Sequence, residues 1–549
     1  MPSSKTAPTL TVLDGLGTDV VAEIDVDTLK WRFFELGLLA GIALQMFAVS
    51  LVLILAANDA INELSALYYP LFRGCFLLSF FGVLFGLLTF AWKRTGIDYA
   101  MIFNVSASKS NYHAILREAC SLMVVNFVSF ITYWLTCTVQ LTPSKAIWPL
   151  AAFLGTLIRL GAPFDWMPQW QDASQRAALV RTAGRALLAP VTSPSFATSF
   201  VADVFTSMPK CFIDLLFSTC IYASGEALFV GEWHERTQSY DRGLAVCTTE
   251  DAGYHAAYVL LSALPFVIRL LQCARQISDS VRAGGRGWRQ PLANASKYCM
   301  ALFVVLLSIF GGRTDVWLAA SICSTAFAFS WDVLIDWGLG PQPLRRALRR
   351  TLEPDAPPSS REFDGASWWL RPVRVFPTSW YVTAVGLDLL ARLGWAVYIS
   401  PGQTVVAQHV TLLLGTVELF RRALWSLFRV EWEQIRRVAV EEARRKSIGG
   451  RLSNVHRSSA HALHRDDKQQ PSAPRDEAEA ERAASLRQPL LASSEAATAS
   501  AASERSVQSV AESSDESKED RIHRALQRNI QRMETKTNLL VSPDGGDAA

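Results

Sequence analysis

Aromatic residues are absent from both ends of this 549-residue chain, because every Trp, Phe and Tyr lies within residues 31–440. Residues 441–549 are rich in Ser, Ala, Glu and Arg, so they cannot bury enough apolar surface to offset the entropy lost on ordering. We therefore expect a short polar N-terminus over residues 1–30 and a disordered tail over 441–549. Within the tail, residues 516–540 have a weak apolar stripe that predicts a short helix.

The signatures of several functional classes are also missing. The chain has no G-x-x-x-x-G-K-[ST] loop, no paired His motif and no nucleophile elbow, so we expect neither an ATP-driven pump nor an enzyme. Its nine cysteines include no C-x-x-C pair, which argues against a zinc site and a disulfide framework. A net charge of +3 provides no basic field for nucleic acid. We expect no cofactor and no metal.

Long apolar runs dominate the rest of the chain, half of whose residues are hydrophobic. A helix needs about 20 apolar residues to cross a bilayer. Ten such runs lie at 33–57, 71–92, 118–140, 145–162, 199–223, 252–275, 297–311, 315–338, 378–400 and 403–425. The sequence thus predicts an all-α polytopic membrane protein with about ten transmembrane helices, four within residues 31–165 and six within 166–440.

The charges of the loops predict the orientation of these spans, since Lys and Arg accumulate on the cytosolic side of short loops. The loops after the second, fourth, sixth and eighth runs are basic. The first loop, residues 58–70, has no Lys or Arg. The fifth loop, residues 223–251, is acidic on balance. Both termini, including the tail, are therefore expected in the cytosol.

Ionisable residues inside the spans are concentrated in the last six. A charge at the bilayer centre is disfavoured by about 3 kcal/mol on insertion scales, so such residues usually face a cavity and have partners. The residues in question are Asp203, Asp214, Arg269, Arg275, Lys297, Tyr298, Asp332, Asp336, Asp388, Arg392, Glu418, Arg421 and Arg422. Asp332 and Asp336 are four positions apart and should share one helix face.

These charges predict a polar path through a six-helix bundle. Arg suits an oxyanion because its planar guanidinium matches two oxygens of a phosphate or carboxylate. Nearby carboxylates would position the Arg side chains and limit how tightly the anion binds, which a permeating ion requires. Two structural interpretations stay open: Asp388 and Arg392 as an ion pair within one helix, and Asp336, Arg421 and Arg422 as interfacial charges. A proton-coupled transporter or a cation channel could use the same residues.

Several segments resemble the EXS domain, the membrane domain of eukaryotic phosphate exporters of the retrovirus-receptor type and of plant root-to-shoot exporters. They are YYPLFRG at 68–74, FVADVFTSM at 200–208, LPFVIRLLQCARQISDS at 264–280, NASKY at 294–298, FSWDVLIDWGL at 329–339, DLLARLGWAVYIS at 388–400 and VELFRRALWSLFRVEWEQ at 417–434. They occur in the family's order. The resemblance implies ten transmembrane helices, the last six of which form the phosphate pathway.

The resemblance also implies roles for individual residues. Positions that bind phosphate or line the pathway fall on Asp203, Lys297, Tyr298, Asp332, Asp336, Arg392, Glu418, Arg421 and Arg422. Trp395 resembles the family's gate, while Arg269 and Arg275 match basic positions at the cytosolic end of the path. Inorganic phosphate is thus the expected partner, moving down its electrochemical gradient.

One departure from the family concerns regulation. The large exporters carry an SPX domain, which senses inositol pyrophosphates, before the membrane part. Only about 30 residues precede the first run here, too few for such a domain. Unless the sequence is truncated, the chain resembles the SPX-less branch, which includes a fungal Golgi protein linked to recycling of phosphate.

Some alternatives stay open at this point. The chain could act as a Golgi membrane scaffold that retains glycosylation enzymes by contact, or it could export another anion. The Golgi and the plasma membrane both remain candidate locations. Membrane lipids are expected partners, and a homodimer is a further hypothesis.

Overall fold

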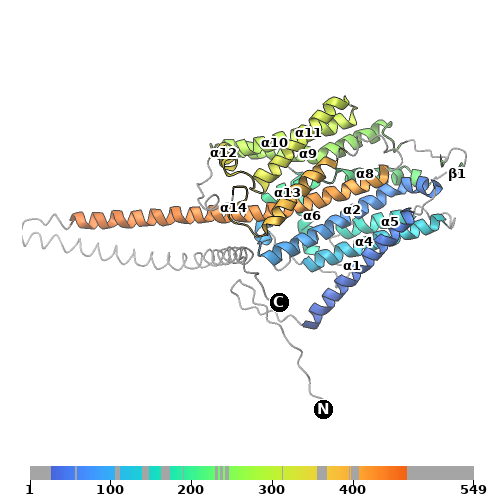
Figure 1. The fold of residues 1–549 in the computed structure, drawn as a ribbon, viewed down its shortest axis with the longest axis horizontal. Coiled ribbons are helices and arrows are strands. Elements are labelled where there is room, and N and C mark those ends of the chain that lie inside the picture. Colours follow the sequence, from blue (N-terminus) through green and yellow to red (C-terminus); the bar gives the residue numbers. More distant parts are fainter. Residues whose placement is uncertain are drawn as a thin grey trace, which may run out of the picture.

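A computed structural model describes most of the chain between Val26 and Asp466 (Figure 1). The described residues are 26–55, 59–104, 112–138, 147–161, 173–188, 191–228, 233–234, 239–240, 246–311, 313–354, 368–394, 396 and 407–466. The helix predicted at 516–540 lies outside these residues, as does most of the predicted N-terminal segment.

Helices make up nearly all of the described structure. The first half contains α1 (Val26–Leu55), α2 (Asp59–Thr95), α3 (Tyr99–Phe103), α4 (Tyr112–Thr138), α5 (Ile147–Gly161) and α6 (Ala173–Leu187). The second half contains α7 (Phe196–Phe205), α8 (Pro209–Ala223), the 3₁₀ turn η3 (Glu226–Leu228), β1 (Trp233–His234), β2 (Ser239–Tyr240), α9 (Ala252–Arg282), α10 (Arg289–Ile309), α11 (Thr314–Trp331), the π-helix η4 (Asp332–Asp336), α12 (Gln342–Leu352), α13 (Thr378–Arg392) and α14 (Ala407–Asp466). The two short strands pair antiparallel, with Trp233 opposite Tyr240.

The predicted fold class, an all-α polytopic membrane protein, is confirmed. Six described helices are long and apolar enough to cross a membrane, namely α1, α2, α4, α9, α10 and α11 with η4. The pair α7 and α8 makes a seventh candidate, bent by 64° where Pro209 starts a new helix. The remaining predicted runs coincide with α5, α13 and the start of α14, which are shorter or more polar. The count of ten spans therefore stays a prediction.

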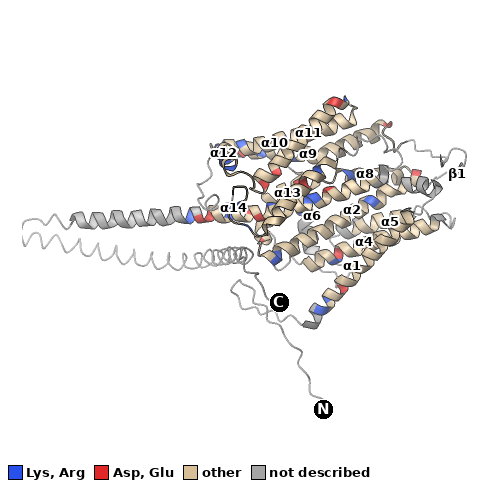
Figure 2. Ribbon diagram, in the orientation of Figure 1, with Lys and Arg blue, Asp and Glu red and all other residues tan. Residues whose placement is uncertain are grey.

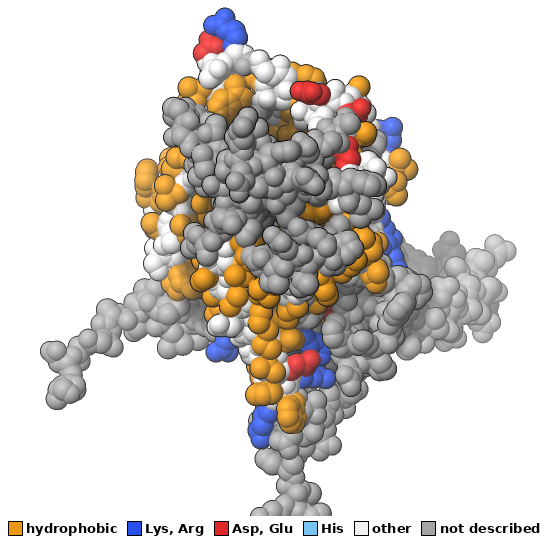
Figure 3. Space-filling model, turned by 90° about the vertical axis from the view of Figure 1, so that its right-hand side faces the viewer, with side chains coloured by type: hydrophobic (Ala, Val, Ile, Leu, Met, Phe, Trp, Pro, Cys, Tyr) orange, Lys and Arg blue, Asp and Glu red, His pale blue; other side chains and the backbone are white. Residues whose placement is uncertain are grey.

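The surfaces of these helices fit a lipid environment. Large apolar side chains point outward along the bundle, among them Leu260, Phe303 and Leu390, which are 62%, 51% and 68% exposed. Figure 3 shows hydrophobic side chains along the flanks of the bundle, seen from the end opposite the projecting part of α14. Contact with lipid tails stabilises such side chains where water would not.

Buried aromatic side chains hold α14 inside the bundle. Trp92 on α2 and Trp337 after η4 are fully buried, and both pack in one apolar core with Phe428. The Trp92 indole donates to the Leu427 carbonyl at 3.4 Å, and the Trp337 indole donates to the Trp425 carbonyl at 3.2 Å. These contacts fix the position of the α14 segment that carries the predicted site residues.

The expectation that disorder begins at residue 441 is wrong for residues 441–466. There, α14 continues without a break and projects from the bundle (Figure 1). An ion pair between residues four positions apart supports the start of this part, with Arg445 Nε 3.3 Å from a Glu441 carboxylate oxygen. Extending an existing helix also avoids the unfavourable nucleation step. A composition without aromatics excludes a packed core, but it does not exclude a helix.

One disulfide joins Cys220, at the end of α8, to Cys247, just before α9. The cysteine spacing argued against a disulfide framework, and the thiols of Cys75, Cys120, Cys211, Cys273, Cys299 and Cys323 are free. This single bond forms because the fold brings the adjacent ends of α8 and α9 together, which no spacing rule reveals.

Candidate functional site

Buried charges of the second half of the chain gather between α7, α9, α10, η4, α13 and α14 (Figure 2). They form two groups. We name the first the Asp203 cluster, consisting of Asp203, Arg269, Gln272 and Tyr298. The second is the Arg421 cluster, consisting of Asp332, Asp388, Arg392, Glu418 and Arg421. Together they contain seven of the twelve site residues predicted from the sequence: Asp203, Arg269, Tyr298, Asp332, Arg392, Glu418 and Arg421.

The Asp203 cluster joins α7, α9 and α10. The Arg269 Nε lies 2.8 Å from Asp203 Oδ1, and the Tyr298 hydroxyl donates to the same carboxylate oxygen. Arg269 also donates to the Tyr298 hydroxyl at 3.0 Å and to the side-chain oxygen of Gln272. Arg269 and Asp203 therefore neutralise each other at contact distance, and Arg269 and Tyr298 hold the Asp203 carboxylate in place.

The Arg421 cluster joins η4, α13 and α14. Arg421 Nη1 lies 3.0 Å from Asp388 Oδ1 and 3.5 Å from Asp332 Oδ2, while its Nε and Nη2 contact Glu418 at 2.8 and 2.7 Å. Arg392 pairs with Asp388 at 2.9 Å and also with Asp332. The ion pair predicted within α13 is thus present, but it is part of a network that crosses three elements.

Asp332 and Asp336 both face α14, so their predicted shared face is confirmed. The Trp425 indole donates to Asp336 Oδ2 at 3.0 Å, and Arg429 Nε lies 3.4 Å from Asp336 Oδ1. The backbone between the two aspartates is a π-helix, closed by the Trp337 amide donating to the Asp332 carbonyl at 2.9 Å. Such wide turns are frequent at functional sites.

The interpretation of Arg421 and Arg422 as interfacial charges is wrong. The two residues are only 3% and 8% exposed. Asp336 is buried as well. An Arg that extends to the membrane surface keeps its guanidinium in water, and these side chains do not.

Lys297, which is partly buried, and Arg422, which is buried, differ from the other cations of the site. Neither lies within 4 Å of a carboxylate oxygen in the described part of the chain. The Lys297 ammonium instead lies 4.6 Å from the centre of the Tyr298 ring and 5.4 Å from that of Trp331. Arg422 donates to the Ser207 hydroxyl at 2.7 Å and to the Thr206 hydroxyl at 3.0 Å. Hydroxyls and aromatic rings leave the positive charges available to an anion.

A cavity of about 210 Å³ lies beside the Asp203 cluster. This volume is far larger than one water molecule needs. Of the predicted site residues, Asp203, Arg269, Lys297, Tyr298 and Asp336 line it. Neither Arg422 nor the residues of the Arg421 cluster line the cavity. Trp425 does line it, and the Arg422 guanidinium lies 4.7 Å from the centre of the Trp425 ring.

The cavity extends toward the end of the bundle where α14 projects. Arg429 and Arg436 of α14 line it there, together with Gln276 of α9 and Gln290 of α10. Glu433, one turn from each of these arginines, pairs with Arg429 at 3.3 Å. Burial raises the pKa of the Glu433 carboxyl, but the neighbouring Arg429 and Arg437 outweigh it, so the pKa lies below its usual value. The mouth of the cavity therefore carries positive charges from arginines and the negative charge of the Glu433 carboxylate.

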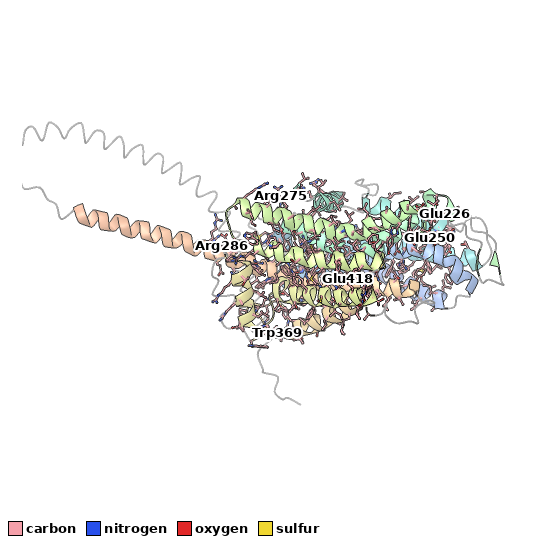
Figure 4. The ribbon with its side chains drawn as sticks, turned by 90° about the horizontal axis from the view of Figure 1, so that it is seen from above. Glu226, Glu250, Arg275, Arg286, Trp369 and Glu418 are labelled. Atoms are coloured by element: carbon pink, nitrogen blue, oxygen red, sulfur yellow. A yellow bond between two sulfur atoms is a disulfide. The ribbon has the colours of Figure 1, made fainter. Side chains whose placement is uncertain are left out.

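Of the two predicted site residues that remain, one lies outside both clusters and the other is not described. Arg275 pairs with Asp279 at 2.9 Å near the same end of the bundle and does not line the cavity (Figure 4). Trp395, the residue expected to act as a gate, lies outside the described residues.

The sequence analysis assigned no role to several residues that belong to the site. Trp425 and Arg429 follow Arg421 at intervals of four on α14, so helical periodicity was the signal that could have found them. Asp388 was named only as a structural partner, although it contacts both Arg392 and Arg421.

A buried anchor behind the site was also missed. Arg371, in the irregular segment before α13, is 1% exposed and pairs with Glu431 of α14. Glu431 also accepts hydrogen bonds from the Tyr381 hydroxyl at 2.6 Å and the Val375 amide at 2.8 Å, and Arg371 donates to the Trp337 carbonyl. The anchor thus ties the end of η4 and the start of α13 to α14.

The fold and the buried charges together define a polytopic membrane protein with an ion-pair network beside an internal cavity. The model of the EXS family matches residues 68–435, so the chain belongs to the EXS family.

Curated relatives agree with this assignment. The chain is 25% identical over 430 residues to "Solute carrier family 53 member 1" of Homo sapiens, covering 74% of this chain and 56% of the relative. It is 24% identical over 428 residues to the "Xenotropic and polytropic retrovirus receptor 1 homolog" of Xenopus laevis, covering 74% and 55%. It is 24% identical over 393 residues to "SPX and EXS domain-containing protein 5" of Dictyostelium discoideum, covering 67% and 38%. The chain therefore matches about half the length of its animal relatives.

Proposed function

We propose that this protein transports inorganic phosphate across a membrane, down the electrochemical gradient of the ion. The observation that carries the proposal is a pair of cations, the partly buried Lys297 and the buried Arg422, neither of which has a described carboxylate oxygen within 4 Å. A buried charge is stabilised by a partner of opposite sign, and a transported oxyanion supplies one. Membership of a family with solute-carrier relatives supports the same conclusion.

Phosphate would bind between these two cations, beside Asp203. Electrostatic interactions connect the Asp203 carboxylate with both Lys297 and Arg422. Arg422 offers a planar guanidinium whose contacts in this structure are the hydroxyls of Ser207 and Thr206 and the ring of Trp425. The Tyr298 hydroxyl, which is bound to Asp203, holds that carboxylate away from the anion.

The charge balance of the site favours transport over tight capture. It contains seven cations, Arg269, Lys297, Arg392, Arg421, Arg422, Arg429 and Arg436, and seven carboxylates, Asp203, Asp332, Asp336, Glu353, Asp388, Glu418 and Glu433. An anion that enters such a neutral network is attracted by nearby cations and repelled by the acids around them. Binding is therefore weak enough for the ion to leave, as conduction requires.

The orientation of the protein follows from its two unlike ends. Arg275 and Arg286 lie at the end from which α14 projects, whereas Glu226 and Glu250 lie at the other end (Figure 4). We infer that the basic end faces the cytosol. The Cys220–Cys247 disulfide lies at the opposite end, where an oxidising lumen or the cell exterior would maintain it. The cavity then opens toward the cytosol, and phosphate passes the Arg421 cluster to reach the other side.

Phosphate flux into liposomes that contain the purified full chain tests the proposal. Wild type should carry radiolabelled phosphate well above empty liposomes, and Arg422→Ala and Lys297→Ala should each lower the flux at least ten-fold. The control is Arg313→Ala, because Arg313 is 80% exposed and pairs only with its neighbour Asp315 in the described structure. Equal flux in wild type and Arg422→Ala would overturn the site assignment.

The same assay separates phosphate from other anions. Excess unlabelled phosphate should suppress the flux, whereas sulfate or chloride at the same concentration should not. Suppression by sulfate alone would favour export of another anion. The absence of flux from wild type would favour a scaffold role, which predicts that charge-neutralised variants still retain glycosylation enzymes.

A further inference from the structure

Uncharged polar side chains line the cavity beside the charged ones. Ser199 precedes Asp203 by four residues on α7, and Asn294 precedes Lys297 by three residues on α10; all four residues line the cavity. Side chains at these spacings share a helix face and lie about one turn, or about 5 Å, apart along the axis. Ser199 and Asn294 therefore each lie about one turn from the hydrogen bond between Tyr298 and Asp203 that joins the two helices.

Each of these two side chains has an oxygen atom without a hydrogen-bond partner. In the described part of the structure, Ser199 Oγ and Asn294 Oδ1 are covered from solvent, and neither makes a hydrogen bond. Such atoms are uncommon in proteins, because a buried polar atom loses its bonds to water and needs a replacement. A change in one side-chain torsion can turn either oxygen toward a ligand in the cavity that the two residues line.

The surroundings of Asn294 determine which of its side-chain atoms is left for a ligand. The side chain interacts with the buried thiol of Cys273 on α9. Because the Asn294 oxygen has no partner, the amide nitrogen makes this contact. Asn294 therefore has an acceptor to offer, one turn from the Lys297 ammonium, which can only donate.

We propose that Asn294 selects phosphate over sulfate by accepting a hydrogen bond from the P–OH group of the anion, an inference that rests on the proposed transport of phosphate. At neutral pH phosphate carries at least one P–OH group, whereas sulfate carries no hydroxyl. A cation attracts both anions, but only phosphate can donate to the Asn294 oxygen. A site built to bond a hydroxyl group disfavours an analogue that lacks it, because the acceptor of the site then stays unpaired.

The position of Asn294 suits selection at an early stage of the path. On α10 it lies between Gln290, which lines the cavity toward its mouth, and Lys297. An anion that enters from the mouth thus meets Asn294 before it reaches Lys297 and Arg422. Selection here precedes contact with the guanidinium groups, whose planar shape matches the oxygens of any such oxyanion. Ser199 has a different part, because its hydroxyl can donate to an oxygen of either anion.

Binding of radiolabelled phosphate to the full chain in detergent, in competition with sulfate and with monofluorophosphate, tests the proposal. Monofluorophosphate has the charge of hydrogen phosphate but a fluorine in place of the hydroxyl. Wild type should bind phosphate at least about ten-fold more tightly than either competitor, and Asn294→Leu should reduce this preference to about two-fold. Ser199→Ala should weaken all three anions alike, by about three-fold. The matched control is Ser321→Ala, whose hydroxyl is also buried and unpaired within the described residues but does not line the cavity, and it should change nothing.

Two results would overturn the role of Asn294. The folded Asn294→Leu variant could keep the wild-type preference, which would place selection elsewhere, or it could lose affinity for all three anions equally, which would make the residue structural. If this variant does not fold, wild type decides, because equal affinity for phosphate and monofluorophosphate excludes recognition of the hydroxyl. Selection and transport fail separately: an unchanged preference together with phosphate flux into liposomes refutes only the role of Asn294. Absence of phosphate binding and flux in wild type refutes the proposed function as well.

Discussion

The two halves of the bundle bury different kinds of side chain. In the first half, α2, α4 and α5 pack through aromatic rings such as Tyr68, Phe130 and Trp134. In the second half, the helices around α14 bury carboxylates and guanidinium groups in direct contact. Apolar packing suffices to hold membrane helices together, and a buried ion pair is often no more stabilising than a hydrophobic pair. The charges of the second half are therefore better explained by a role in transport than by stability.

One ion pair connects the halves. Arg73 of α2 contacts Asp214 of α8 through two hydrogen bonds, of 2.7 and 2.5 Å, and both residues are buried. Neither Arg73 nor Asp214 lines the cavity beside the Asp203 cluster or the small pocket between α12 and α14. We regard it as structural, and this makes it the natural counterpart against which to compare the Arg421 cluster.

The largest effect is expected from Arg421→Ala. The change removes the cation that contacts Glu418 and leaves Asp332 and Asp388 with Arg392, and removing one partner from a buried ion-pair network costs about 3–5 kcal/mol. The unfolding temperature in detergent should fall by several degrees, and phosphate flux should be lost. A variant with wild-type unfolding and flux would show that the cluster is dispensable.

The Arg73–Asp214 pair should respond differently. Either Arg73→Met or Asp214→Leu alone should destabilise the protein by about 3 kcal/mol, because each leaves one buried charge. The two changes together should restore the unfolding temperature to within about 1 kcal/mol of wild type and retain the flux. Loss of flux in a stable double variant would move this pair from the structural to the functional class.

A smaller effect is expected at the disulfide. Cys220→Ser should lower the stability of the α8–α9 connection by about 2–4 kcal/mol under oxidising conditions. The same variant should match wild type when both are measured in reducing agent. Because the bond lies away from the charges, phosphate flux at a temperature well below unfolding should change less than two-fold.

The smallest effect is expected from Arg117→Gln in the first half. Arg117 lies 3.5 Å from Glu35, whose side chain is 47% exposed, and such exposed pairs contribute less than about 1 kcal/mol. Unfolding temperature and flux should both stay within error of wild type. A large loss of flux here would contradict the division of the bundle into a packing half and a transport half.

Much of the site was predictable because its residues lie on continuous helices. Asp332 and Asp336 follow helical spacing, and both indeed face α14. Arg421 and Arg422 were both predicted to line the pathway, but they have different surroundings although they are neighbours in the sequence. Arg421 is surrounded by carboxylates, whereas Arg422 contacts hydroxyl groups and the Trp425 ring. That difference depends on which helices lie beside each face of α14.

The sequence by itself determined that this chain is a polytopic membrane protein with its charges in the second half, because hydropathy and the cost of inserting charge are local properties. It also identified the family through motifs on η4 and α14. Only the tertiary structure decided which charges are paired. Arg269 and Arg421 are held by carboxylates, and Lys297 and Arg422 are not. The anchor at Arg371 and the Cys220–Cys247 bond likewise depend on contacts between separate segments of the chain. The same holds for α12, whose Thr351 carbonyl accepts a hydrogen bond from Arg289 of α10. No local sequence pattern encodes such contacts.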